Sequence, residues 1–422
     1  MSKKTLAVFI YLQDQCVPAG LLELTEDGTE VIASSFRYGL KYLDRPNAIA
    51  VDPVSLAITD REAIRGKELL PVEGLTLFGG IRAAAPDAWG RRVIEARFKA
   101  PLNSLPESAY LLEAGNQRVG ALDIRPSLEA QPHIVKNSIH RLEYLMEAAD
   151  RIEQGLPIPA QLEDIFLAGS QLGGMRPKAG VEDDAGVLWL AKFRSHGERL
   201  DVPWIEAATL MLASDAGLNV PAVRTETLGG KTVMLIRRFD RDLIDGAQRR
   251  RHLVSALTLL GCHEAESSTK SYADIADAIR SRIGKEGIKV DLLELFGRMV
   301  FNILVSNDDD HLRNHAFLWD PATNAWRLSP LYDVMPRPAL ATERLLHIGV
   351  GQQGRLATLD NALSDYARFG ITKGDALAVI DRIWRVVREW KTRFEGYGVP
   401  GQEIEKIAPA FRHIDEVLSH NK

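Results

Sequence analysis

The hydrophobic pattern changes along the chain from the period of β-strands to the period of α-helices, and this change constrains the fold more than any other feature. Residues 5–36 contain short strand-like runs, with turns predicted at residues 18–20 and 26–28. Beyond about residue 250, the apolar residues recur with helical spacing instead. The sequence therefore predicts an α+β fold in which a β-rich part precedes a mainly α-helical part.

The segment between these two parts mixes both patterns. Pro86 and Asp87 open a helix that runs to about Phe98, because proline fits the first helical turn and aspartate favours its positive end. The other predicted elements are helices at 139–154, 203–216, 291–306, 373–394 and 402–419, strands at 187–193 and 232–239, and a hairpin around 320–324.

Composition argues against several classes of protein. The 422 residues, 45% of them apolar, suffice for a large core. The chain lacks both a run of about 18 apolar residues and a secretory cleavage pattern, so we expect a cytoplasmic protein. Cys16 and Cys262 are too few and too far apart for a disulfide scaffold. The net charge of −5 argues against direct DNA binding, and the three arginines at 249–251 are expected to form a solvated loop.

The segment at 306–314 carries the strongest chemical signal. It reads Ser-Asn-Asp-Asp-Asp-His-Leu-Arg-Asn and follows an apolar helix. Three consecutive carboxylates repel one another, and a cation or a nearby base relieves that repulsion, so a metal site or catalytic site is indicated. A polar loop with capping aspartates is the alternative for this window alone.

The spacing of the polar residues favours phosphoryl transfer. Asp309 and Asn314 stand five residues apart, as the base and the metal-binding asparagine do in a kinase catalytic loop. Asp309 is expected to receive the proton of a hydroxyl group, and Asn314 to offer an amide oxygen to Mg²⁺. Asp333 follows the predicted hairpin and is the candidate second ligand, although such an aspartate is commonly a turn residue. His311 is expected either to touch the nucleotide or to stabilise the loop.

Residues upstream of this segment fit the binding of phosphates. The glycine-containing stretch 168–178 can bring backbone amides and cations close to phosphates, although an ordinary loop is the alternative. Lys192 lies alone in an apolar strand, and Glu206 on the following helix is its candidate partner, in the arrangement by which kinases position ATP. A lysine whose ammonium group snorkels to the surface is the alternative for Lys192.

These motifs together resemble the HipA family of bacterial toxin kinases, over nearly the whole chain. The segment 309–314 is similar to the family's Asp-x-His-x-x-Asn motif, and 331–334 to its metal-binding segment. The stretch 238–241, Arg-Phe-Asp-Arg, is similar to an element near the nucleotide, and 169–178 resembles the phosphate loop of one branch of the family.

The resemblance implies a protein-kinase-like fold with two lobes: a mixed α/β N-lobe with an extra N-terminal subdomain, and an α-helical C-lobe. The divisions predicted are 1–125, 126–245 and 246–422. The implied activity is that of a serine/threonine kinase that uses ATP and Mg²⁺ and phosphorylates a translation protein, such as an aminoacyl-tRNA synthetase, to arrest growth and promote persistence. A helix-turn-helix antitoxin is the implied partner, through which alone operator DNA is expected to be bound.

The resemblance also assigns residues to the site, with one departure from the family. One branch autophosphorylates a serine at the position that Phe166 holds here, so Ser170 is the nearest alternative. The candidate catalytic residues are Asp309 and His311, the candidate metal ligands are Asn314 and Asp333, and the candidate nucleotide-binding residues are Gly169, Ser170, Gln171, Lys178, Lys192, Glu206, Arg238, Phe239 and Asp240.

Two other functions stay open from the sequence. A metal-dependent phosphohydrolase would use the acids and the histidine at 308–311, since clustered acids and imidazole suit catalytic metals. That reading gives Lys192 and Glu206 no role. A catalytically silent co-repressor that acts with an antitoxin is the third hypothesis, and the intact candidates for base and metal ligands argue against it.

Overall fold

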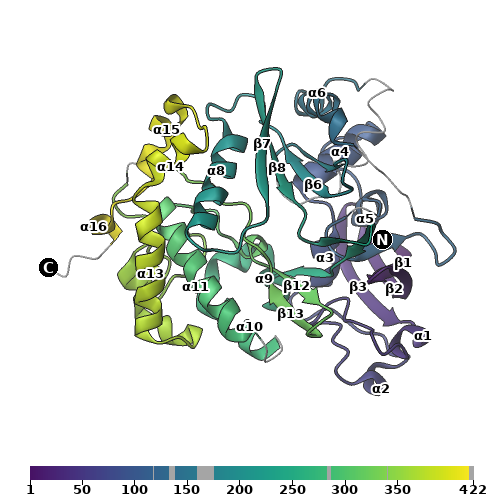
Figure 1. Cartoon of the computed structure of the whole chain (residues 1–422). Helices are drawn as coiled ribbons and strands as arrows, with labels where there is room; N and C mark the ends of the chain where they lie inside the picture. Colours follow the sequence, from purple (N-terminus) through teal and green to yellow (C-terminus); the bar gives the residue numbers. More distant parts are fainter. Residues whose placement is uncertain (117, 133–137, 159–174, 283–286, 340, 418–422) are drawn as a thin grey trace. The chain divides into compact units, whose positions relative to one another are not determined.

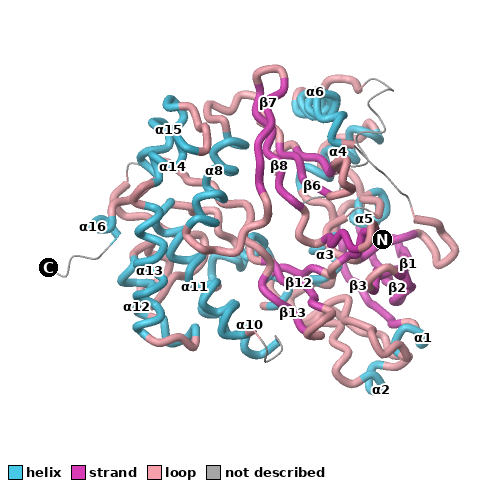
Figure 2. The backbone as a smooth tube through the Cα atoms, viewed as in Figure 1, coloured by secondary structure: helices cyan, strands magenta, loops and turns pink. Residues whose placement is uncertain are grey.

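The computed structural model describes the chain except for residues 117, 133–137, 159–174, 283–286, 340 and 418–422 (Figure 1). The chain forms two compact units. Unit 1 comprises Met1–Gly197 and Glu226–Val254, and unit 2 comprises Glu198–Thr225 and Ser255–Lys422. The strands gather mainly in unit 1, whereas unit 2 is mainly helical (Figure 2). The finer threefold division made from the sequence stays a prediction.

The first sheet of unit 1 is formed largely by the predicted N-terminal strands. Its strand order is β3-β2-β1-β4. The turn predicted at 18–20 is wrong, because these residues lie inside β2 and the chain reverses at Gln13 instead. Pro18 pairs with Phe9 next to a bulge in the register, where the missing N–H of proline is tolerated. The strands are β1 (Ser2–Leu12), β2 (Gln15–Asp27), β3 (Glu30–Tyr38) and β4 (Leu122–Arg125).

The second sheet has the order β5-β6-β8-β7, and two helices pack on it. Apolar residues two apart in β5, β6 and β8, such as Ala179 and Val181, pack against Trp89 of α4 and Leu145 of α6 (Figure 1). The helices predicted at 86–98 and 139–154 correspond to α4 and α6, which cover one face of this sheet. The elements are β5 (Lys178–Glu182), β6 (Leu188–Lys192), β7 (Val223–Leu228), β8 (Lys231–Arg237), α4 (Ala88–Phe98), η1 (Ile139–Arg141) and α6 (Leu142–Glu153).

The arginine run in unit 1 was predicted wrongly. Its first two residues lie in a hairpin of β9 and β10, not in a solvated loop. The guanidinium of Arg250 lies 3.7 Å from the ring centroid of Tyr11 and donates a hydrogen bond to the carbonyl of Asn116. Arg251 pairs with Asp242 at 2.6 Å. The other elements of unit 1 are α1 (Leu40–Leu43), α2 (Arg61–Ile64), α3 (Gly79–Ala84), α5 (Glu107–Glu113), β9 (Arg241–Ile244), β10 (Ala247–Arg250) and β11 (Leu253–Ser255), which ends at the boundary with unit 2.

Unit 2 is built around the helix α11 (Ile288–Val305), most of whose side chains are buried. The helix α13 (Lys373–Val387) packs closely on it, because a Cβ added at Gly297 would lie 3.6 Å from both Val379 and Ile383. The predicted hairpin is confirmed as β12 (Ala316–Asp320) and β13 (Ala325–Leu328). The other elements are α8 (Val202–Asp215), α9 (Ala256–Leu259), η2 (Glu264–Thr269), α10 (Tyr272–Arg282), η3 (Leu312–Asn314), α12 (Leu359–Ser364) and η4 (Tyr366–Phe369).

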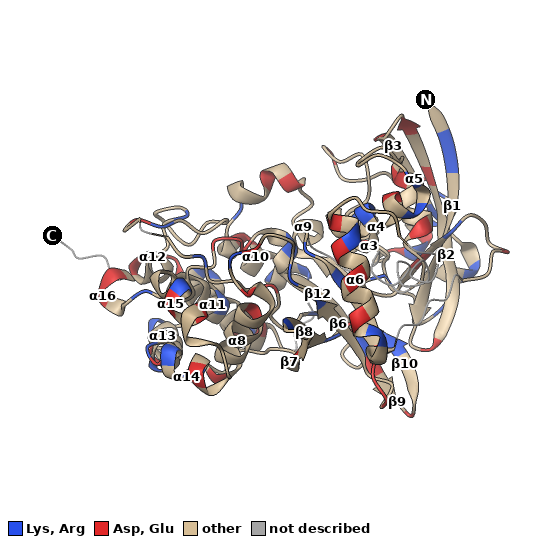
Figure 3. Cartoon of the chain, turned by 90° about the horizontal axis from the view of Figure 1, so that it is seen from above, with Lys and Arg blue, Asp and Glu red and all other residues tan. Residues whose placement is uncertain are grey.

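Two helices predicted at the C-terminal end are each broken. The first ends at Val387 and resumes at Trp390, whose ring stacks on Phe411 with centroids 3.9 Å apart. The second is interrupted by η5, which contains Pro409, a residue that cannot donate a helical hydrogen bond. Exposed helix faces carry both charges, as in the α13 pair Arg385–Asp381 (Figure 3). The elements are α14 (Trp390–Gly396), α15 (Gly401–Ile407), η5 (Ala408–Ala410) and α16 (Ile414–Val417).

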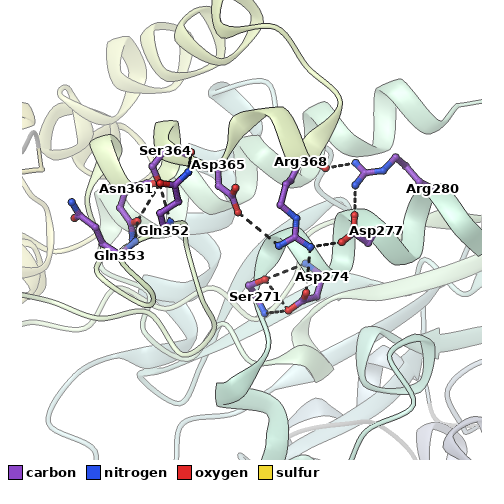
Figure 4. Close-up of polar contacts among 10 residues, drawn as sticks. All are labelled: Ser271, Asp274, Asp277, Arg280, Gln352, Gln353, Asn361, Ser364, Asp365 and Arg368. Atoms are coloured by element: carbon purple, nitrogen blue, oxygen red, sulfur yellow. Dashed lines mark hydrogen bonds and ion pairs between the residues drawn. The ribbon is translucent and has the colours of Figure 1, made fainter.

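Polar contacts hold the beginning of α10 in place (Figure 4). Ser271 and Asp274 cap this helix reciprocally. The main-chain N–H of Ser271 donates to the Asp274 carboxylate at 2.8 Å, and the main-chain N–H of Asp274 donates to the Ser271 hydroxyl at 3.1 Å. Arg368 of η4 forms ion pairs with Asp274 and Asp277. The residue that follows Ser271 is Tyr272, so these contacts fix a side chain that enters the candidate site.

Candidate active site

The acidic segment begins where α11 ends. Ser306 adopts the left-handed conformation, with φ of 52°, and this ends the helix. Asn307 folds back on the helix, because its main-chain N–H donates to the carbonyl of Asn302 at 3.0 Å and its side-chain amide donates to the Asn302 side chain at 3.1 Å. The buried helix therefore delivers the acids to a defined place.

Asp310 is the buried acid of the segment, only 1% exposed. The hydroxyl of Tyr272 donates to one carboxylate oxygen at 2.7 Å, and the main-chain N–H of His347 donates to the other at 2.7 Å. Burial raises the pKa of Asp310 to about 7, although both hydrogen bonds lower it. Asp310 therefore joins the loop to α10 and to the segment around His347, and its carboxylate is shielded from solvent.

Asp309 points to a different partner. Its carboxylate accepts a hydrogen bond from Nη2 of Arg337 at 2.8 Å, and Nε of the same arginine lies 3.1 Å from a carboxylate oxygen of Asp308. The side chain of Asp309 is 48% exposed, so a substrate can approach it. The main-chain carbonyl of Asp309 accepts a hydrogen bond from Nδ2 of Asn314 at 2.8 Å. This bond turns the side-chain oxygen of Asn314 away from that carbonyl and leaves it suited to a cation.

The segment that carries Asp333 lies along the same loop. The hydroxyl of Tyr332 donates to the carbonyl of Arg313 at 2.6 Å, and the main-chain N–H of Met335 donates to the side chain of Asn307 at 3.4 Å. Asp333 itself has φ of 58°, which is uncommon for a residue other than glycine and frequently marks a functional constraint. Tyr332 precedes Asp333 and Arg313 precedes Asn314, so the hydrogen bond between Tyr332 and Arg313 joins the neighbours of the two candidate metal ligands.

His311 contributes a ring at the edge of the loop. Its centroid lies 5.8 Å from that of His347, with the rings almost perpendicular. Nδ1 of His311 is buried and has no hydrogen-bond partner among the residues that the structure describes. Burial lowers the pKa of His347, and the charge on the neighbouring His311 ring lowers it to a smaller extent. This geometry is compatible with both roles predicted for His311.

Oxygen donors at Asn314 and Asp333 fit Mg²⁺, which commonly takes one or two protein carboxylates and completes its shell with water and phosphate oxygens. Within the described part of the chain, no three His, Cys, Asp or Glu side chains gather into a metal cage. Asp308 and Asp309 instead share the cation Arg337, and Asp310 is hydrogen-bonded to Tyr272. The phosphohydrolase hypothesis, which needs these acids to act together, gains no support from this geometry.

The two candidate phosphate-binding lysines are neighbours in unit 1. Lys178 and Lys192 are directly opposed in the β5–β6 register, so their side chains share one face of the sheet. Lys178 is buried and forms an ion pair with Asp87 at 3.1 Å. Asp87 also caps α4, since it accepts a hydrogen bond from the Gly90 amide at 2.8 Å. The sequence indicated the helix start but not the ion pair.

Arg238 and Asp240 belong to a buried ionic network of unit 1. Asp240 lies 2.8 Å from Arg238 and 2.7 Å from Arg241, and it accepts a hydrogen bond from the Gly120 amide at 2.8 Å. Burial alone would raise the pKa of Asp240, but the two guanidinium charges hold it well below its usual range. These side chains join the end of β8 to the loop at 118–120, whereas Phe239 stays partly exposed.

The other nucleotide-binding candidates are placed less fully. Gly169, Ser170 and Gln171, with Phe166, lie outside the described residues. Glu206 is buried in α8 of unit 2, and Lys192 belongs to unit 1, so their pairing stays a prediction.

Comparison with known proteins identifies the family. The family described as HipA-like C-terminal domain matches residues 170–390, just over half of the chain. A protein of Sinorhizobium fredii named putative kinase Y4mE is 27% identical over 152 residues, which cover 34% of this chain and 35% of the relative. The serine/threonine-protein kinase toxin HipA of Shewanella oneidensis is 28% identical over 147 residues, covering 31% of this chain and 33% of that protein. The matches therefore span about a third of each relative.

A solved structure extends the likeness of fold to nearly the whole chain. It contains HipA of Shewanella oneidensis with HipB and operator DNA, and the matched chain aligns with a TM-score of 0.63 and 18% identity. The alignment covers 98% of this chain and 96% of that one. The kinase-like α+β fold predicted from the sequence is thereby confirmed. The chain belongs to the HipA family.

Proposed function

We propose that this protein is an ATP-dependent serine/threonine protein kinase and the toxin of a toxin–antitoxin pair. The observation that carries the proposal is the hydrogen-bonded union of the loop at 306–314 with the segment at 331–337. We take this as support because the loop and the segment carry residue types that phosphoryl transfer requires: an accessible carboxylate at Asp309 and side-chain oxygens at Asn314 and Asp333.

The proposed mechanism depends mainly on positioning. Asp309 receives the proton of the attacking serine or threonine hydroxyl. Asn314 and Asp333 would hold Mg²⁺, which would supply positive charge to the phosphates of ATP. Lys178 and Lys192 provide the cationic face on which those phosphates rest. Arg238 and Asp240 are assigned to the nucleotide site as residues that support its backbone. The other residues that we assign to this site are Gly169, Ser170, Gln171, Glu206 and Phe239.

The biological role follows from the family at a coarser level. A relative is named a serine/threonine-protein kinase toxin, and the similar solved chain is bound to HipB and operator DNA. We infer a helix-turn-helix antitoxin as partner, with operator DNA bound through it, which suits a net charge of −5. No described helix is both long and apolar enough to cross a membrane. The proposed substrate is a translation protein, such as an aminoacyl-tRNA synthetase, and the proposed compartment is the cytoplasm. Within the kinase itself, Ser170 is the proposed site of autophosphorylation.

The proposal is tested by phosphate transfer. Purified protein is incubated with Mg²⁺, γ-labelled ATP and a bacterial extract, beside the variant Asp309→Asn. We expect label on an extract protein or on the kinase itself with the wild type only, and mass spectrometry then identifies the substrate and examines Ser170. If the wild type bound ATP but transferred no label to any protein, the co-repressor hypothesis would replace the kinase.

A further inference from the structure

We propose that Arg337 is a catalytic residue of this site: it orients Asp309 and contacts the phosphoryl group during transfer. This inference rests on the proposed kinase function and adds a residue that the sequence motifs did not indicate. The geometry points to it because Arg337 donates a hydrogen bond to the candidate base itself, at 2.8 Å, and forms an ion pair with the neighbouring Asp308 at 3.1 Å.

The local backbone presents this arginine in a restricted conformation. Arg337 stands between Pro336 and Pro338, and the two proline rings limit both their own φ angles and the conformations of the residues before them. The main-chain N–H of Arg337 donates to the carbonyl of Ser306 at 3.2 Å, which fixes the segment against the end of α11. The side chain therefore leaves from a defined point beside the acids.

The loop does not supply this cation itself. The only lysine or arginine within 306–314 is Arg313, and its guanidinium pairs with Glu264. Because Asp308 and Asp309 are adjacent carboxylates, a positive charge beside them lowers their mutual repulsion. Arg337 provides that charge from a segment more than twenty residues further along the chain.

The guanidinium is also suited to the transferring group. Arginine has five N–H donors in a planar fork, and contacts with the acids engage Nε and Nη2. Nη1 makes no hydrogen bond to another described residue. The side chain of Arg337 is 51% exposed, so a phosphoryl oxygen can reach it. Exposed ion pairs contribute little to stability, so the position is poorly explained by folding alone.

The step that this arrangement serves is balanced. A bond forms between the hydroxyl oxygen of the substrate and the γ-phosphorus of ATP, and the bond from that phosphorus to the β–γ bridging oxygen breaks. ADP leaves with the electron pair, and Asp309 takes the hydroxyl proton. Arg337 meets the negative charge on the phosphoryl oxygens, which is the kind of stabilisation by which arginine accelerates phosphoryl transfer.

The test compares Arg337→Gln, Arg337→Lys and Arg337→Ala with the wild type. We expect Arg337→Gln to lower kcat by roughly 100-fold or more with little change in the Kd for ATP, and Arg337→Lys to retain part of the rate. Added guanidinium ion at millimolar concentration is expected to restore activity to Arg337→Ala, which a merely structural role would not allow. Arg385→Gln is the matched control, since it removes an exposed arginine paired with Asp381 and should leave the rate unchanged.

The outcomes separate this inference from the kinase proposal. If Arg337→Gln transferred phosphate at the wild-type rate and Asp309→Asn transferred none, the proposed role of Arg337 would be overturned. The kinase proposal itself would stand. A lowered rate in Arg337→Ala that guanidinium does not restore, together with a lowered melting temperature, would also overturn it in favour of a structural role. A wild type that transfers no phosphate contradicts the kinase proposal itself.

Discussion

Replacing Tyr272 by phenylalanine removes one oxygen atom from the centre of the candidate site. That oxygen donates to Asp310 at 2.7 Å and accepts a hydrogen bond from Asn302 at 2.9 Å, and all three side chains are buried. Each buried polar group that loses its partner costs about 1–3 kcal/mol. Asp310 keeps the hydrogen bond from the His347 amide, so we expect a total loss of about 2–4 kcal/mol in the free energy of unfolding.

This loss should depend on pH in a defined direction. Between the usual aspartate range and pH of about 7, the folded protein holds a proton on Asp310 that the unfolded chain has released. The free energy of unfolding of the wild type therefore falls as pH rises through this range and levels off above about 7. Without the Tyr272 hydroxyl, which favours the ionised form, the pKa rises further and the fall continues above pH 7. The loss should therefore be about 2 kcal/mol at pH 5.5, where a neutral pair is broken, and closer to 4 kcal/mol at pH 8.5.

Urea denaturation at the two pH values measures the effect, and hydrogen exchange of residues 306–315 shows whether it is local. Tyr144→Phe is the matched control, because Tyr144 is 57% exposed on α6 and its change should stay within about 0.5 kcal/mol. Equal losses at both pH values, or a loss no larger than that of the control, would refute the role given to Asp310 and Tyr272.

Three further changes test other parts of the account. Asp87→Asn keeps an acceptor for the Gly90 amide but removes the charge beside Lys178, so we expect about 1–3 kcal/mol lower stability in urea and weaker ATP binding by calorimetry; unchanged values would contradict the ion pair. Asp240→Asn leaves two buried arginines short of their counter-ion and should cost about 3–5 kcal/mol at pH 7. Most of this cost should persist at pH 3, because the folded pKa lies well below the usual aspartate range and the stability from the carboxylate is lost only as pH falls through that folded pKa. Gly351→Ala places a Cβ 1.9 Å from the carbonyl of Asn361, so a lowered melting temperature is expected, and an unchanged one would show that this segment moves freely.

Patterns that are local in sequence were sufficient for much of this structure. The apolar helix, the acidic loop and the hairpin before Asp333 were each predicted near their observed places, because each has its own periodicity or turn signal. The repulsion among the three acids indicated a metal site or a catalytic site, which stays a prediction; in the structure the guanidinium cation of Arg337 lies beside two of them. The identity of that cation could not be predicted, since no local pattern marks a residue that meets the loop only after folding.

The errors have the same origin. Pro18 and Gly20 look like a turn, but pairing with β1 across a bulge holds them in a strand. The arginine at 250 looks solvated, but the ring of Tyr11, far away in sequence, covers it. Tertiary contacts decided each of these cases against the local preference.

Single-turnover transfer from bound ATP tests the central claim most directly. Wild type and Asp309→Asn are first shown by calorimetry to bind Mg²⁺-ATP equally, and are then mixed with the protein substrate and quenched over time. The account predicts normal occupancy in Asp309→Asn with phosphate transfer slowed at least about 100-fold, because the carboxylate acts on the hydroxyl and not on the nucleotide. Equal transfer rates at equal occupancy would contradict it and show that the loop at 306–314 is not where the chemistry occurs.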